Sequence, residues 1–333
     1  MSQLYPLLML PAFDPRPWGT HDLSPIYPTR KFEEKIGEAW LTGDDCKIAN
    51  GPLTGRTLAQ VSETYQRELV GEAARDSQRF PLLLKFLFPH EKLSVQVHPD
   101  DEQARRVNQP WGKTECWYVA HAKPGAQIAL GLKPGVTVPQ LEQAIQERRA
   151  EELLNWLNVF TGDMIYVSGG TVHTLGPGSV IVETQQQSDT TYRLYDYGRP
   201  RELHLQEGLA AVKVKVASGK VVRPAPAQIG SSKNRQAPLV AAPYFVVDMF
   251  EMKGTQALST RDESGKSSAQ ILVAVEGCGA VEAPGSEAVA FAKGDALVVP
   301  ASLEKFTVRP QWSLELLRAR VPGVALPEPQ TRM

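Results

Sequence analysis

Short runs of strand-forming residues, separated by glycine and proline, restrict the possible folds of this chain more than any other feature. The 26 Gly and 26 Pro are spread along the 333 residues rather than clustered. Apolar and β-branched runs lie between them at 93–98, 115–120, 126–131, 163–168, 179–184, 244–252, 269–277 and 295–300. Many short strands with turn signals at close spacing are typical of a β-sandwich or β-barrel. We therefore expect a mostly β fold.

Helical signals are few, and we expect them to be small insertions on the β scaffold. Apolar residues recur at helical spacing within residues 54–75, and Asp100 can cap a helix over 100–108. Residues 139–157 predict one or two further helices, with a proline near the start. Ordinary packing helices with no role in a site are the simplest interpretation of all three segments.

The length and an internal repeat indicate two β units. Residues 219–243 are rich in Pro, Ala, Ser and Gly, which predicts a linker or crossing segment between units at 1–218 and 244–333. The segments that begin at Gly162-Asp163 and Gly294-Asp295 each run through a strand-like stretch into a turn of small residues. A duplicated β unit explains this likeness, although chance similarity of two Gly-Asp turns remains an alternative.

Composition and charge exclude several classes of protein. With 36 Lys plus Arg against 37 Asp plus Glu, the net charge is −1, which gives no footprint for nucleic acid or an anionic membrane. The three cysteines contain no CxxC pair, which argues against a disulfide framework and fits a reducing compartment. No apolar stretch reaches the roughly 20 residues of a membrane span. We expect a cytoplasmic protein, a monomer or homodimer, with no nucleic-acid or membrane partner.

Four polar segments carry the functional signal. In a strand, Ser94, Gln96 and His98 share one face while two valines share the other, which suits either the wall of a polar cavity or a solvent-facing edge. Lys113 and Glu115 likewise share a face, just before an apolar strand. The third segment is a glycine turn that ends at His173, and the fourth is the polar run over 182–196.

Taken together, these segments supply a set of metal ligands. Gln96, His98, Glu115 and His173 provide nitrogen and oxygen donors of the kinds that zinc, and other transition metals, accept. Two histidines, one carboxylate and a weak oxygen ligand leave room for water or substrate, as catalytic zinc sites do. The residues alone therefore predict a β-barrel enzyme with a zinc-type centre. In the second unit, the ungapped alignment puts Lys305 opposite His173, and an ammonium cannot ligate a metal. We thus expect residues 244–333 to be free of metal.

The sequence resembles the type I mannose-6-phosphate isomerases, in their short bacterial form. The strings that carry the resemblance are SVQVHPDD, GKTECWYV, GDMIYVSGGTVHTLG and VETQQQSDTTYRLYDYGR, with RPWG, IGEAWLTG and FPLLLKFLF before them. The likeness covers roughly residues 1–215. It implies a pair of cupin jelly rolls, one zinc ion per chain, and reversible isomerisation of mannose 6-phosphate to fructose 6-phosphate.

The resemblance also implies roles for individual residues. The family's zinc ligands fall on Gln96, His98, Glu115 and His173, and its catalytic arginine falls on Arg193. Other positions that match the family's pocket are Lys113, Glu183, Asp189 and, for the substrate phosphate, Ser94. The remaining basic candidates for the phosphate site are Lys92, Lys85, Arg199 and Arg201, among which the sequence does not choose.

The implied chemistry is proton transfer through an enediol or enediolate intermediate. Zinc polarises the substrate oxygens, and Arg193 holds developing negative charge because a guanidinium does not act as a base. Lys113, Glu183, Asp189 and a metal-bound water are candidates for the proton carrier. A surface pair of Arg193 with Asp196 is the alternative for that arginine. Alternatives for the whole chain are another metal-dependent cupin enzyme, such as an iron oxygenase, and a non-catalytic cupin that senses sugar phosphates.

Overall fold

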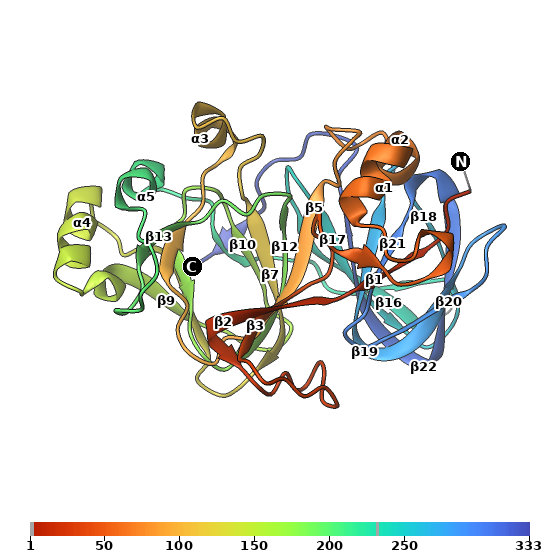
Figure 1. Cartoon of the computed structure of the whole chain (residues 1–333), viewed down its shortest axis with the longest axis horizontal. Coiled ribbons are helices and arrows are strands. Elements are labelled where there is room, and N and C mark those ends of the chain that lie inside the picture. Colours follow the sequence, from red (N-terminus) through yellow and green to blue (C-terminus); the bar gives the residue numbers. More distant parts are fainter. Residues whose placement is uncertain (1–2, 231–232) are drawn as a thin grey trace.

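The computed structural model describes residues 3–230 and 233–333, and in these residues the strands form three antiparallel sheets (Figure 1). A ten-stranded sheet contains, in spatial order, β15 (Ala227–Ile229), β16 (Asn234–Ala241), β17 (Val246–Met252), β22 (Lys305–Arg320), β19 (Gln270–Glu282), β21 (Ala296–Val299), β1 (Leu7–Leu10) and β4 (Lys47–Ile48), with β18 (Gln256–Ser259) beside β22 and β20 (Val289–Ala292) beside β19. An eight-stranded sheet contains β2 (Ala12–Thr20), β3 (Ile36–Trp40), β5 (Leu82–Leu87), β12 (Ser179–Gln186), β7 (Glu115–Ala122), β10 (Met164–Val167), β14 (Gly219–Val221) and β23 (Thr331–Arg332). A five-stranded sheet contains β13 (Tyr192–Tyr195), β6 (Val95–Val97), β11 (His173–Leu175), β8 (Gln127–Leu132) and β9 (Leu154–Asn158). The expectation of a mostly β chain is confirmed.

The helices are short and lie at the edges of the sheets (Figure 1). They are α1 (Leu58–Tyr65), α2 (Arg67–Val70), α3 (Asp101–Arg106), α4 (Val138–Gln146) and α5 (Leu205–Ala211), with 3-10 turns η1 (Gly51–Leu53), η2 (Ala150–Leu153) and η3 (Ala301–Leu303). Thr57, Asp100 and Thr137 close capping boxes at the starts of α1, α3 and α4, which explains where these helices begin. No helix in the described residues is long and apolar enough to cross a bilayer.

The expected helix over 139–157 ends early. Helix α4 stops at Gln146, and residues from Leu154 onward form strand β9. The reason is tertiary, because β9 pairs with β8 and places Leu157 opposite Ile128. The leucines of this segment have helical spacing, but pairing with the edge of the sheet at β8 decides its conformation.

Three apolar clusters explain how the sheets pack. The largest lies between the ten-stranded and eight-stranded sheets and includes Leu7, Tyr166 and Phe245. A second lies between the eight-stranded and five-stranded sheets, around Trp117 and Ile128. The third fills the inside of the C-terminal unit; its members include Phe250, Leu272 and Phe306. Strand β7 therefore presents alternate residues to two different apolar clusters. Its first residue, Glu115, lies on the same face as Trp117, at the edge of the cluster between the eight-stranded and five-stranded sheets.

The two ends of the chain cross between the units. Strand β1, near the N-terminus, pairs with β21 of the C-terminal unit. Strand β23, at the C-terminus, pairs with β14 in the sheet of the N-terminal unit. In Figure 1 the N end accordingly lies among the blue strands and the C end among the green ones. The residues expected to form a linker, 219–243, contain the whole of β14, β15 and β16. The division into units at 1–218 and 244–333 stays a prediction. Each unit contributes one terminal strand to the sheet of the other.

The Gly-Asp turns of the two units share one hydrogen-bond pattern. Gly162 and Gly294 both have a φ of 90°, in the left-handed region that glycine adopts readily. In each unit the following carboxylate, of Asp163 or Asp295, accepts the backbone N–H three residues earlier at 2.9 Å. The strands that follow, β10 and β21, pair with β7 and β19 in the same antiparallel sense. These matched turns support the duplicated unit.

The structure differs from the sequence alignment at the next turn. Lys305 is exposed, and the neighbouring Phe306 is 2% exposed inside the C-terminal core. Glu304 adopts a left-handed φ of 53° at the end of η3, and the next inward side chain is therefore Phe306 rather than Lys305. Phe306 lies opposite Leu258 in the β22–β18 ladder, as His173 lies opposite Gln96 in the β11–β6 ladder. Apolar side chains thus occupy the place of the polar pair.

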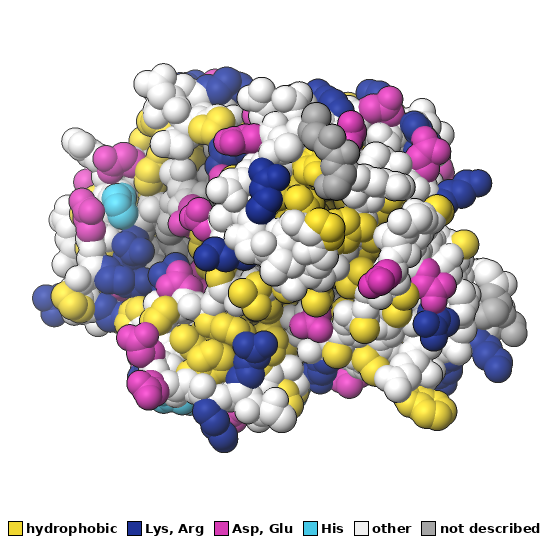
Figure 2. All heavy atoms as spheres, turned by 45° about the vertical axis from the view of Figure 1, so that its right-hand side comes forward, with side chains coloured by type: hydrophobic (Ala, Val, Ile, Leu, Met, Phe, Trp, Pro, Cys, Tyr) yellow, Lys and Arg dark blue, Asp and Glu magenta, His cyan; other side chains and the backbone are white. Residues whose placement is uncertain are grey.

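The outer surface carries both signs of charge. Figure 2 shows Lys and Arg side chains interspersed with Asp and Glu over the face drawn, with hydrophobic side chains between them. No single-sign field covers this face, in keeping with the net charge of −1.

Candidate metal centre and substrate pocket

Four side chains converge where the eight-stranded and five-stranded sheets meet. Gln96 lies on β6 and His98 just after it, Glu115 begins β7, and His173 begins β11. The ladder puts His173 directly opposite Gln96. The expected alternation holds, because Val95 and Val97 pack in an apolar cluster on the other face of β6. The two histidines are distant in the sequence, and strand pairing brings them together.

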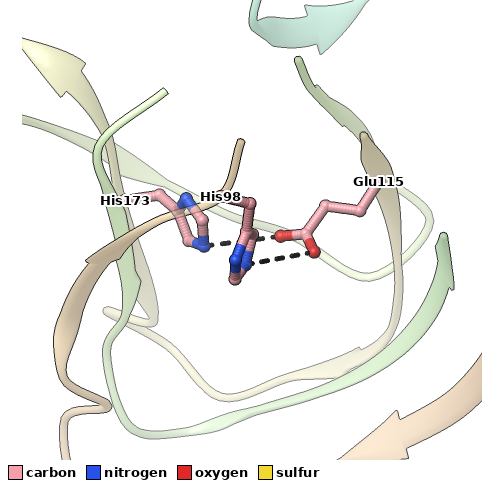
Figure 3. Close-up of side chains that lie close together, drawn as sticks. All are labelled: His98, Glu115 and His173. Atoms are coloured by element: carbon pink, nitrogen blue, oxygen red, sulfur yellow. Dashed lines mark ion pairs between the residues drawn. The ribbon is translucent and has the colours of Figure 1, made fainter. Parts of the chain in front are cut away.

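The two histidines and the glutamate face one another across a small buried space (Figure 3). Nε2 of His98 lies 3.5 Å from Oε2 of Glu115, and Nε2 of His173 lies 3.4 Å from Oε1. The three candidate ligand atoms lie within 4.8 Å of one another. Nε2 of Gln96 lies 3.2 Å from Nε2 of His173, so the amide of Gln96 adjoins the same space.

Hydrogen bonds from outside the cluster fix both imidazoles. Nδ1 of His98 lies 3.0 Å from the carbonyl oxygen of Thr190, and Nδ1 of His173 lies 2.9 Å from that of Thr171. A ring that donates from Nδ1 to a carbonyl carries its lone pair on Nε2, the atom that faces the cluster. Such outer hydrogen bonds orient histidine ligands in metal sites.

Burial makes the cluster electrostatically unusual. Desolvation, followed by the charge of Lys113, lowers the pKa of His98 well below its usual range, and desolvation lowers the pKa of His173 to about 4. Burial, with the charge of Glu183, raises the pKa of Glu115 to about 8, against the opposing charges of Lys113 and Lys85. The contacts of Figure 3 therefore join neutral imidazoles to a carboxyl group that resists ionisation, and they are not true ion pairs.

The residues fit a bound cation. Both carboxylate oxygens of Glu115 are buried and form no hydrogen bond with any described residue. A buried carboxylate without hydrogen bonds is costly unless a cation lies against it. The ammonium of Lys113 lies 3.6 Å from Oε2, too far for a hydrogen bond, and Oε1 has no cation of the described residues against it. Two neutral Nε2 atoms beside it complete a donor set of nitrogen and oxygen that suits a transition metal.

A pocket of 460 Å³ opens beside this cluster. The residues expected at the site that line it are Ser94, Gln96, Lys113, Glu183, Asp189 and Arg193, and two further basic candidates that line it are Lys85 and Arg201. Among the residues that the structure describes, Lys92 and Arg199 do not line this pocket. The ammonium of Lys92 instead pairs with Glu151 at 2.6 Å.

Arg193 projects into the pocket from β13, beside Gln96 of β6. One guanidinium nitrogen, Nη1, donates to the carbonyl oxygen of Glu202 at 2.8 Å, and Nε is buried without a partner among the described residues. The carboxylate of Asp196 is bound by Arg199 at 3.1 Å and Arg201 at 2.7 Å. The surface pair of Arg193 with Asp196 is thus not formed.

Lys113 and Glu183 form the wall nearest the metal cluster. Nζ of Lys113 lies 3.1 Å from Nε2 of His98. Glu183 accepts a hydrogen bond of 3.0 Å from the indole N–H of Trp117 and forms an ion pair of 3.2 Å with Lys85. The ion pair lacks hydrogen-bond geometry, since Oε1 of Glu183 has no hydrogen-bond partner among the described residues.

Sequence reasoning missed part of the pocket wall. Arg16, Trp18 and Glu38 line it from β2 and β3. Glu38 is buried between Lys85, at 3.5 Å, and Arg16, at 3.3 Å. The motif RPWG contains two of these residues, but nothing local in it indicates which pocket they reach.

Known proteins resemble this chain over almost its whole length. Residues 23–110 match the family model for the catalytic domain of type I phosphomannose isomerase. The mannose-6-phosphate isomerase ManA of Bacillus subtilis (strain 168) is 34% identical over 313 residues, which are 90% of this chain and 95% of that protein. This chain belongs to the type I mannose-6-phosphate isomerases. It is an aldose–ketose isomerase that acts on a sugar phosphate, and the oxygenase and sensor alternatives are set aside.

Two solved structures of mannose-6-phosphate isomerases have the same fold as this chain. The crystal structure of the B. subtilis enzyme covers 94% of this chain and 99% of its own, with a TM-score of 0.83 and 30% identity. The structure of a zinc-bound mannose 6-phosphate isomerase covers 95% of this chain and 99% of its own, with a TM-score of 0.74. At 16% identity the second likeness shows the fold alone. The cupin architecture expected for the isomerase is confirmed.

Proposed function

We propose that the enzyme binds one zinc ion per chain and uses it to interconvert mannose 6-phosphate and fructose 6-phosphate through an enediolate. The observation that carries the proposal is the buried cluster of two Nε2 atoms around a carboxylate without hydrogen bonds. His98, Glu115 and His173 would hold the metal, with Gln96 as a weaker fourth ligand. Zinc is the metal bound to the mannose 6-phosphate isomerase of the same fold.

The metal, when bound, would supply Lewis acidity to the carbonyl and hydroxyl oxygens of the open sugar. The protein groups would do the rest. Arg193 stays cationic and has a buried Nε–H without a partner among the described residues, so it would hold the negative charge that develops on the enediolate. A preorganised charged donor of this kind favours the transition state because no reorganisation is needed during the reaction.

Three side chains of the pocket can carry the proton between adjacent sugar carbons. Lys113, Glu183 and Asp189 all line it. Glu183 is held by Trp117 and Lys85, and Lys113 is held beside His98, so both have fixed orientations. We propose that Lys113 and Glu183 share the proton transfer and that Asp189 serves substrate binding. The variants Lys113→Met, Glu183→Gln and Asp189→Asn, assayed in D₂O for deuterium at C1 of the fructose 6-phosphate formed from mannose 6-phosphate, test this assignment. A Glu183→Gln enzyme that exchanges as fast as the parent would contradict it.

A coupled assay on mannose 6-phosphate tests the metal directly. Prolonged chelation should abolish turnover, added zinc should restore it, and metal analysis should give one zinc per chain. His173→Ala should lose most of the bound zinc, because it deletes one of few strong ligands. His90→Ala is the matched control, since His90 is exposed and lies outside the cluster. Stoichiometric zinc in a variant that lacks both His98 and His173 imidazoles would contradict the proposed ligands. Equilibration from either sugar phosphate to the same ratio tests reversibility.

A further inference from the structure

The pocket carries more positive than negative side chains. Five cationic residues line it, against three anionic ones, Glu38, Glu183 and Asp189. The cationic residues are Arg16, Lys85, Lys113, Arg193 and Arg201. A sugar phosphate brings up to two negative charges, so this surplus matches the ligand in sign. The question is which cation meets the phosphate.

Several of these cations have other partners. Lys85 is buried between two carboxylates, with its ammonium 3.5 Å from Glu38 and 3.2 Å from Glu183. Its charge is therefore balanced within the protein. Lys113 lies against His98, at the metal end of the pocket. A phosphate on C6 lies at the other end of the sugar from the carbons that react, so Lys113 is poorly placed for it.

Arg16 has the properties that a phosphate site needs. It lies on β2 at the pocket wall, and its side chain is 30% exposed. Its contacts with Glu38 run from Nε at 3.3 Å and Nη2 at 3.4 Å, and its contact with Asp14 also uses Nη2, at 2.7 Å. These contacts leave Nη1 for a ligand. An arginine held along one edge is preorganised, which reduces the entropy lost on binding.

Glu38, the carboxylate that holds the guanidinium of Arg16, is ionised at neutral pH. Burial opposes ionisation of Glu38, but the charges of Lys85 and Arg16 prevail and hold its pKa at about 2. The indole N–H of Trp40 donates to the same carboxylate at 2.7 Å. Glu38 therefore holds the guanidinium in one orientation across the working pH range.

Arg16 is separated from the metal cluster but shares the pocket with the other arginines. The contacts from Arg16 run through Glu38, Lys85 and Glu183 to Trp117, whose ring packs against His173 with centroids 5.3 Å apart. Arg201 lines the same pocket, and its Nε and Nη2 both bind Asp196 at 2.7 Å. Two oriented guanidiniums thus line the pocket, and neither contacts the metal ligands.

We infer that Arg16, together with Arg201, binds the phosphate group of the substrate. The inference adds to the isomerase activity and rests on it only for the identity of the ligand. The N-terminal strand β2 accordingly belongs to the substrate site. Charge-assisted hydrogen bonds from a planar fork are the usual means of phosphate recognition by arginine.

Arg16→Gln and Arg16→Lys test the inference. In Arg16→Gln, the KM for mannose 6-phosphate and the inhibition constant of inorganic phosphate should rise together, by about 10- to 100-fold, the range expected for loss of a charged hydrogen bond. The kcat should stay within a few-fold of the parent, and Arg16→Lys should fall between the two because it keeps the charge without the fork. Arg309→Gln is the matched control, since that guanidinium pairs with Glu282 on the C-terminal unit and lies outside the pocket.

Phosphate binding can also be measured without turnover. Titration of inorganic phosphate, followed by the ³¹P NMR linewidth, should give a weaker dissociation constant for Arg16→Gln than for the parent and for Arg309→Gln. Equal phosphate affinity in parent and Arg16→Gln would overturn the inference, and so would a loss of kcat and thermal stability with an unchanged phosphate inhibition constant. A parent that binds phosphate but does not turn over mannose 6-phosphate would contradict the proposed reaction and leave the role of Arg16 intact.

Discussion

Removal of the Lys85 ammonium should destabilise the enzyme strongly and in a pH-dependent way. Lys85 is 4% exposed and is shared by Glu38 and Glu183. Lys85→Met leaves both carboxylates without this partner in a buried site. Breaking a buried pair from one side costs about 3–5 kcal/mol, because the remaining charge is uncompensated.

The depressed pKa of Glu38 gives the size of the same effect at one of the two carboxylates. Its pKa falls from the usual value of 4.5 to about 2 in the folded protein. At about 1.4 kcal/mol for each pKa unit, this difference adds roughly 3 kcal/mol to the free energy of unfolding at neutral pH. The charges of Lys85 and Arg16 together produce it. Because the folded pKa is depressed, the stability is fully present above about pH 4.5. It is lost as the pH falls from there towards 2.

Urea denaturation followed by tryptophan fluorescence, with chelator in every buffer, measures this prediction. At pH 7, Lys85→Met should lower the free energy of unfolding by about 3 kcal/mol. The difference from the parent should narrow between about pH 4.5 and 3, as the carboxyl of Glu38 becomes protonated in the variant. Lys293→Met is the control, because its partner Glu276 is 60% exposed and such surface pairs contribute less than about 1 kcal/mol. A loss below about 1 kcal/mol for Lys85→Met, or a difference that does not change with pH, would refute the reasoning.

Further substitutions probe the site at other points. Arg193→Ala should lower kcat by about 10²-fold or more while zinc content and Tm stay at the parent values; turnover within a few-fold of the parent would show that its charge is not used. Lys92→Met should leave the KM for mannose 6-phosphate within about twofold, because its ammonium pairs with Glu151 away from the pocket, and a tenfold rise would return it to the phosphate site. Trp117→Phe removes the indole N–H that binds Glu183, so kcat/KM should fall about tenfold and unfolding should become easier by about 2 kcal/mol, whereas parent-like values would contradict a role for that bond.

Local patterns in the sequence were sufficient for the strands that carry the metal cluster. Alternation around Gln96 and His98 predicts a strand with one polar face, and that alternation depends only on backbone geometry. Glycines before His173 predict a turn, and the strand that follows begins at that residue. The chemistry of the donor set then indicates a metal before any distance is known.

Features that depend on distant segments were not predictable in the same way. Glu38 lies 22 residues from Arg16 and 47 residues from Lys85, and although Lys85 stands out within an apolar run, nothing local pairs it with the other two. Their meeting depends on the order of β2, β3 and β5 in one sheet, which no short motif encodes. Strand β9 was mistaken for helix for the same reason, because its partner strand decided its conformation.

The exchange of end strands between the two units has a consequence for biosynthesis. Strand β1 leaves the ribosome early, yet its partner β21 is made only at residues 296–299. The sheet of the catalytic unit, in turn, gains its last strand only with residues 331–332. Until residue 299 is translated, β1 lacks its partner β21, and until residue 332 is translated, the eight-stranded sheet lacks its edge strand β23. The last strand pairings of both sheets therefore form only after most of the chain has been made, which departs from the usual order in which an N-terminal domain folds first.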